Sequence, residues 1–225
     1  LLVAITGPLD RLSRDRSFSL YIFQQMLLVF AVPPLLLAGL PDWMLRPVLL
    51  NRFVEPIARL VTRPIVAFLT FAAVFTIIHY PTVCDRICHA HPFYGDIHAV
   101  LLFTGSLLWW PLMSPLPEYP RMSYPMQIMY LFLLMIPMTA VAAPITMATS
   151  VLYVFYAVGT HPLGLSAMED QVLGGIIMWV GQGVYIMFVF TVIFARWART
   201  DDQEMPPINR AAQIRVLQPH ARSHN

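Results

Sequence analysis

The chain has 225 residues, of which 58% are hydrophobic and only 12% are charged. A soluble domain carries about a quarter charged residues, so this composition excludes an ordinary soluble protein and indicates a membrane protein. The basic residues are all arginines, and the net charge of +2 is spread along the chain without a concentrated basic surface. Nucleic-acid binding is therefore not expected.

Long apolar runs predict membrane-spanning helices, because a helix needs about 20 apolar residues to cross a bilayer. Five runs are long enough: Phe18 to Leu40, Arg63 to Tyr80, Ile97 to Met113, Met126 to about Tyr156, and Val172 to Trp197. The fourth contains two prolines, which remove backbone donors, so we expect one tilted, bent span there. Leu1 to Thr6 has the composition of the end of a further helix. The predicted fold is all-α, a polytopic transmembrane helix bundle with five complete spans and the end of a sixth.

Residues 42 to 60, between the first two complete spans, alternate arginines with apolar side chains. Pro47 and Pro56 are expected to interrupt any regular helix in this segment. The pattern predicts a segment lying on the membrane surface, with an ordinary polar connector as the alternative.

The distribution of arginines predicts the orientation of the bundle. Ten of the fourteen fall on one face of the predicted topology and four on the other. Basic residues accumulate on the cytoplasmic side of membranes, so the polar tail 200–225 is predicted to be cytoplasmic. The loops 81–96 and 157–171 are then extracytoplasmic, and residues 1–199 form the transmembrane domain.

Most histidines and both cysteines fall on the predicted extracytoplasmic side: His79, Cys84, Cys88, His89, His91, His98 and His161. Ionisable groups at membrane depth are costly and usually mark functional sites. His79 closes one span and His98 opens the next, so a hairpin would place both at the same depth. A single histidine there is more often bonded to water or backbone, but the clustering on one face favours a site.

The segment from Cys84 to His91 is the densest part of this cluster. Thiolate and imidazole are the ligands that monovalent copper or zinc prefers. A disulfide is an alternative, although a four-residue separation within a helix fits disulfide geometry poorly. Covalent haem is another, because Cys84-x-x-x-Cys88-His89 is one residue longer than the usual haem-attachment signature. The last alternative to a metal site is that both cysteines are reduced and have no function.

The last span opens with Asp170, Gly174 and Met178 at intervals of four, which places them on one helix face. Glycines permit close approach of another helix, and a methionine thioether is a copper ligand as well as a packing group. Asp170 is also expected to cap the N-terminus of its own helix, where a carboxylate meets unpaired amides. Capping and metal ligation are compatible.

Several motifs, taken together and in order, resemble the multi-spanning CtaG family of cytochrome c oxidase assembly factors. They are Gly7-Pro8-Leu9-Asp10-Arg11-Leu12, Gln24-Gln25-Met26-Leu27-Leu28, Pro33-Pro34-Leu35-Leu36-Leu37, His79-x-Pro81, His98, Trp109-Trp110-Pro111-Leu112 and Asp170-Gln171-x-x-Gly174-Gly175-x-x-Met178-Trp179. The resemblance runs from about residue 6 to 197. It implies a multi-pass protein of the bacterial inner membrane that helps to form active terminal oxidase by supplying copper, with polar positions His79, His98, Asp170 and Met178.

One departure from the family pattern matters for function. The family usually has a histidine just before the methionine of the first matched span, and this chain has Gln25 there. An amide does not replace imidazole as a strong copper ligand.

Two functions therefore stay open, and an ordinary enzyme is not expected. The first is a copper-handling assembly factor for a haem-copper oxidase that takes copper from a periplasmic donor. Its metal site would combine Cys84, Cys88 and His98 with His79, Asp170 and Met178. The second is a structural subunit of a larger respiratory or photosynthetic membrane complex that keeps the fold without metal.

Overall fold

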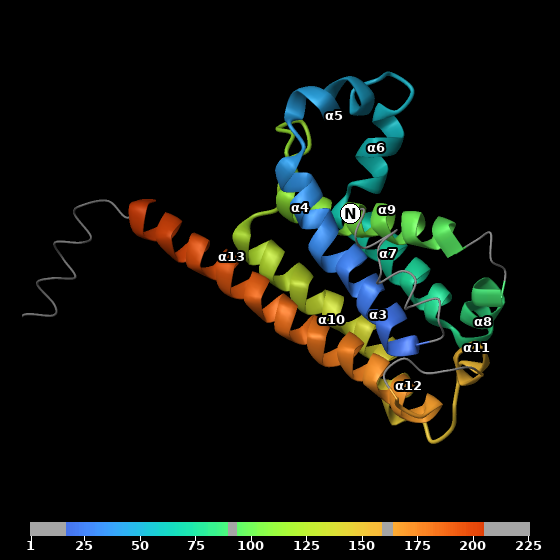
Figure 1. Cartoon of the computed structure of the whole chain (residues 1–225). Coiled ribbons are helices and arrows are strands. Elements are labelled where there is room, and N and C mark those ends of the chain that lie inside the picture. The colour runs from blue at the N-terminus through green and yellow to red at the C-terminus, as the bar shows by residue number, and fades with distance from the viewer. Residues whose placement is uncertain (1–16, 90–93, 159–163, 205–225) are drawn as a thin grey trace, which may run out of the picture.

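The structure is a computed structural model, and it describes residues 17–89, 94–158 and 164–204. In these ranges every regular element is a helix, as the all-α prediction requires (Figure 1). In chain order the elements are α3 (Phe18–Met26), the π-helical turn η1 (Leu27–Ala31), α4 (Val32–Gly39), α5 (Asp42–Leu49), α6 (Glu55–Val61), α7 (Pro64–His79), α8 (Pro81–His89), α9 (Tyr94–Met113), α10 (Tyr124–Met147), α11 (Val154–Ala157), α12 (Ala167–Ile176), the π-helical turn η3 (Ile177–Gly181) and α13 (Gln182–Glu204).

Four helical runs are long and apolar enough to cross a membrane: Phe18–Gly39, Asp96–Met113, Tyr124–Met147 and Ala167–Thr200. A fifth exists if α6 and α7 form one span with a bend of 74°. By itself α7 has 16 residues, which rise about 24 Å and fall short of a bilayer core of about 30 Å. The structure thus supports four to five spans, and the segment Leu1 to Thr6 lies outside the described residues.

The fourth predicted span ends earlier than expected, at Met147 instead of near Tyr156. The backbone beyond it is held by side chains of other helices. Gln171 of α12 accepts a hydrogen bond from the N–H of Leu152 at 2.7 Å and donates one to the carbonyl of Ser150 at 3.3 Å. Asp85 of α8 accepts from the N–H groups of Val154 and Phe155, each at 3.2 Å. These side chains satisfy the backbone groups that a continued helix would have paired internally.

The segment 42 to 60 forms α5 and α6, which project from the bundle (Figure 1). Contrary to expectation, Pro47 lies inside α5, whereas Pro56 occupies the first turn of α6, where a missing N–H costs nothing. No residue of α5 is buried and only Ala58 of α6 is. Trp43 and Phe53 are each 71% exposed. A projecting pair of helices with exposed apolar side chains agrees with the predicted surface segment.

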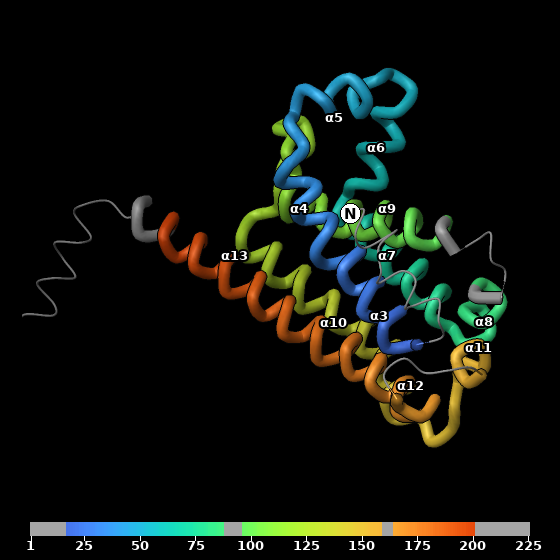
Figure 2. Tube along the Cα trace, in the orientation of Figure 1, coloured from blue at the N-terminus to red at the C-terminus, as the bar shows by residue number. Residues whose placement is uncertain are grey.

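The first described span lies beside the last (Figure 2). α3 packs on α12 and η3, while α7 packs on α9 and α10 packs on α12 and α13. Two glycines permit these contacts: a Cβ on Gly174 would lie 2.6 Å from the Phe18 ring, and one on Gly175 would lie 2.9 Å from the backbone N of Thr146. The Gly174-Gly175 pair therefore allows α3 and α10 to approach α12, as the sequence predicted for these residues.

Candidate functional site at one end of the bundle

Asp170 caps the N-terminus of α3, the neighbouring helix. Its Oδ2 accepts from the N–H of Phe18 at 2.6 Å, and its Oδ1 accepts from the Ser17 hydroxyl at 3.0 Å and the Ser19 N–H at 3.3 Å. The Ser19 hydroxyl also donates to Oδ1. Both carboxylate oxygens are engaged, and the carboxylate faces the positive end of the α3 dipole.

The prediction that Asp170 caps its own helix is wrong. Ser166 is the N-cap of α12, and its side chain accepts from the N–H of Glu169 while the Glu169 side chain accepts from the N–H of Ser166. This reciprocal pair fills the capping position. Asp170, one residue further on, is thereby left to point at α3.

A chain of contacts joins this cap to the end of α7. The Phe18 ring stacks on the Tyr153 ring with centroids 4.3 Å apart, and the Tyr153 hydroxyl donates to the carbonyl of His79 at 2.8 Å. All four residues of the chain, Asp170 included, are at most 3% exposed. Asp170 and His79 therefore belong to one packed end of the bundle.

The imidazole of His79 has a fixed orientation. Its Nδ1 lies 2.8 Å from the carbonyl oxygen of Phe75. A carbonyl oxygen only accepts, so Nδ1 carries the proton and Nε2 of the neutral ring has a lone pair. Nε2 is buried and makes no hydrogen bond to the described residues. Metal-binding histidines usually have this arrangement, in which one ring nitrogen is held by a backbone carbonyl and the other is available.

His98 lies at the same end of the bundle as His79. α7 ends at His79, His98 is about one turn into α9, and the two helices pack on each other (Figure 1). His98 is 2% exposed, so its ring also lies in the interior. The placement agrees with the hairpin predicted from the sequence.

The thiol cluster is described only in part. Cys84 is buried in α8, whereas the structure does not describe the side chains of Cys88 and His89, and His91 and His161 lie outside the described residues. α8 is a continuous α-helix over both cysteines. In such a helix Cβ atoms four residues apart are about 5–6 Å from each other, too far for a disulfide without unwinding.

Met178 has no exposed surface and lies in η3, two turns beyond Asp170. Among the residues that the structure describes, no three His, Cys, Asp or Glu side chains are grouped closely enough to hold a metal ion. The six predicted ligands are thus not shown to form one metal site. The oxygens of Asp170 accept hydrogen bonds from the start of α3, and the side chain of Cys88 is not described.

The sequence analysis missed the groups that complete this region. Ser17 and Ser19 donate to Asp170, and Tyr153 holds the end of α7. A Ser-Phe-Ser sequence directly before a long apolar run is a helix-start signal that could have identified the first two. Tyr153 gives no such signal, because its partner is the backbone of a residue 74 positions away.

A sequence profile of the cytochrome c oxidase caa3 assembly factors, Caa3_CtaG, matches residues 1–200. The chain belongs to this family. The match covers every described span and the whole candidate site, so the resemblance seen in the sequence motifs is confirmed.

Three mycobacterial relatives of this Caa3_CtaG chain are themselves uncharacterised proteins. Those of Mycobacterium bovis and Mycobacterium tuberculosis are each 27% identical over 217 residues, which is 89% of this chain and 33% of the relative. One of Mycobacterium leprae is 26% identical over 142 residues, which is 62% of this chain and 21% of the relative. The chain spans about a third of the length of the first two. No solved structure matches it.

Proposed function

We propose that the chain holds monovalent copper in transit at the end of α7 that adjoins α8 and α9, and passes it to a haem-copper terminal oxidase. The observation that supports this function is His79, whose buried Nε2 lone pair is oriented by the carbonyl of Phe75. Membership of a family of cytochrome c oxidase assembly factors supports the oxidase as the protein that receives the copper. The donor would be a periplasmic copper protein, with this end of the bundle extracytoplasmic and the C-terminus cytoplasmic in a bacterial inner membrane.

Copper is the cargo of this site, so its ligands must both bind it and release it. His79 and His98 offer imidazoles from two packed helices, and Cys84 and Cys88 add soft thiolates from α8. Met178 lies in η3, which packs on α3, α10, α12 and α13, and is therefore left out of this shell. Asp170 serves as a positioning group, because its oxygens fix α3 and are not available for metal.

Replacing His79 by alanine should weaken copper binding by at least about tenfold, because the ligand with the fixed ring is lost. The measurement is anaerobic titration of the purified full chain in detergent with monovalent copper, against a chromophoric chelator as competitor.

Replacing both Cys84 and Cys88 by serine should also lower the amount of bound copper. The copper affinity of the wild type should weaken as pH falls, because the cysteine thiols must lose protons to bind the metal.

The control is His220→Ala, which removes an imidazole from the predicted tail and should leave the affinity unchanged. Circular dichroism and gel filtration of each variant show that the fold is intact. Equal copper affinity of the wild type and His79→Ala would refute the copper function.

Gln25 favours a second function, that of a structural subunit in a larger respiratory or photosynthetic membrane complex. It is fully buried, and neither amide atom forms a hydrogen bond with the described residues. It stands where the family resemblance implies a histidine. If wild-type protein holds no copper, yet co-purifies with oxidase or other complex subunits, this second function is correct.

A further inference from the structure

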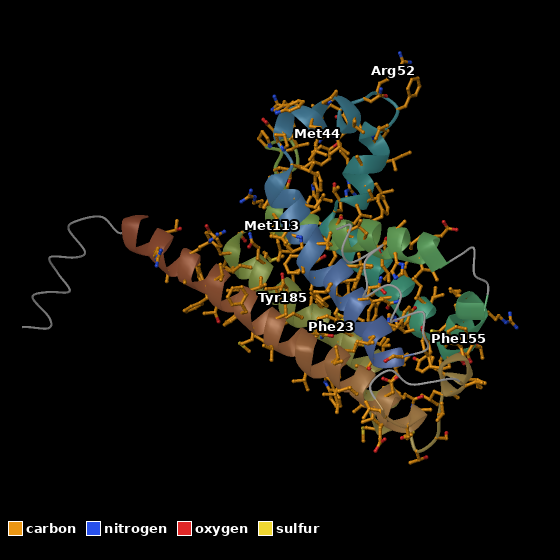
Figure 3. All side chains as sticks on the ribbon, viewed as in Figure 1. Phe23, Met44, Arg52, Met113, Phe155 and Tyr185 are labelled. Atoms are coloured by element: carbon orange, nitrogen blue, oxygen red, sulfur yellow. The ribbon has the colours of Figure 1, made fainter. Side chains whose placement is uncertain are left out.

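A cavity of about 290 Å³ lies at the other end of α7, where α6 turns into it. It is lined by Arg59, Thr62, Arg63, Pro64, Trp110, Glu118, Tyr119 and Pro120. Figure 3 shows Met44 and Arg52 on the α5–α6 projection and Phe155 at the opposite end of the bundle, where α7 ends at His79. The cavity is therefore separate from the candidate copper site.

Two of the lining residues, Arg63 and Trp110, carry hydrogen-bond donors without acceptors in the described structure. The Arg63 guanidinium forms no ion pair with the described residues, whereas Arg59 is paired with Glu55 at 2.7 Å. Trp110 is 8% exposed, and its indole Nε1 is buried without an acceptor in the described structure. Arg63 and Trp110 both line the cavity, and a guanidinium together with an unpaired indole N–H suits an anion with several oxygens, such as a phosphate.

A third lining residue, Glu118, carries an acceptor without a donor in the described structure. Glu118 Oε1 pairs with Arg46 of α5 at 2.7 Å, and Glu118 Oε2 is buried without a hydrogen bond to the described residues. A buried carboxylate oxygen without a donor is costly, so a cation in the cavity would offset that cost. The cavity thus combines a place for an anion with a place for a hydrogen-bonding cation.

We propose that this cavity binds the headgroup of phosphatidylethanolamine, with the phosphate at Arg63 and Trp110 and the primary ammonium at Glu118. A lipid, in preference to a free phosphate compound, is supported by the surface of α7 beside the cavity. Ile65 and Leu69 are 73% and 58% exposed and lie four residues apart on one helix face. They provide a path for an acyl chain from the headgroup into the apolar layer.

The test is native mass spectrometry of the purified full chain in detergent with lipids of identical acyl chains. Phosphatidylethanolamine should bind about tenfold more tightly than phosphatidylglycerol, which has no ammonium, or phosphatidylcholine, whose trimethylammonium cannot donate a hydrogen bond. Arg63→Ala should weaken binding of all three lipids. Inorganic phosphate should not displace the bound lipid.

Two variants that break the same ion pair distinguish the headgroup site from a structural role. Glu118→Gln should abolish the preference for phosphatidylethanolamine, whereas Arg46→Ala should keep it, because Glu118 Oε2 is retained. Arg52→Ala, an exposed arginine that lies over the Phe53 ring, should change nothing. Equal binding of the three lipids by wild type, equal effects of Glu118→Gln and Arg46→Ala, or displacement by inorganic phosphate would each overturn the proposal.

Discussion

Asp170→Ala should lower the free energy of unfolding by about 3 kcal/mol, because it removes a cap and leaves buried donors without acceptors. The hydroxyl of Ser17 and the N–H groups of Phe18 and Ser19 lose their acceptor at once. Water has little access, since Ser17, Phe18 and Ser19 are each 1% exposed. The measurement is chemical unfolding of the purified protein in mixed micelles, followed by circular dichroism.

Glu169→Ala is the matched control, because it removes the neighbouring carboxylate from the same helix turn. Glu169 caps only its own helix, at the surface. Glu169→Ala should therefore lower the free energy of unfolding much less than Asp170→Ala does. Asp170→Asn keeps one acceptor oxygen and should fall between the two. Equal destabilisation by Asp170→Ala and Glu169→Ala would show that the contact with α3 contributes little.

Gly175→Ala should destabilise the bundle by about 2 kcal/mol, because its Cβ would press into the backbone of α10. The new carbon would lie 2.9 Å from the backbone N of Thr146 and 3.1 Å from its Cα, besides meeting the Thr146 hydroxyl. Thr146 is the second-last residue of α10, so relieving the contact would displace the end of α10 from α12. Thermal unfolding monitored in detergent should show a lower midpoint.

Gly183→Ala serves as the control for the intrinsic preference of alanine. Nothing lies within 4 Å of a Cβ at Gly183, which is in α13. Alanine should there raise the stability by about 0.5–1 kcal/mol, since glycine costs more backbone entropy in a helix. An equal gain at Gly175 would show that α10 and α12 are not closely packed at this point.

The sequence was sufficient to predict the spans wherever an apolar run determines the helix by itself. The first span was predicted as Phe18 to Leu40 and is observed as Phe18–Gly39. The end of α10 could not be predicted in this way. It depends on Gln171 and Asp85, two side chains from other helices that hold the backbone after Met147.

The candidate site shows the same division between local and distant information. The positions of His79 and His98 follow from the helix ends that carry them. The partner of Asp170 does not, because an acidic residue near a helix start indicates a cap without saying which helix it caps. From the sequence, the arginines at the α6–α7 turn predicted only the topology. The cavity that they line also contains Trp110 and Glu118, which are distant in the sequence and come together only in the tertiary structure.

The bond from Phe18 to Asp170 joins groups 152 residues apart, and this separation has a consequence for biogenesis. α3 enters the bilayer during synthesis long before its acceptor in α12 has been translated. The N–H groups at the start of α3 therefore lack this acceptor until α12 has been inserted beside α3. A chain interrupted before Ser166 should expose these groups and be degraded faster than the 225-residue chain in pulse–chase labelling, so that membrane quality control would recognise molecules that lack α12.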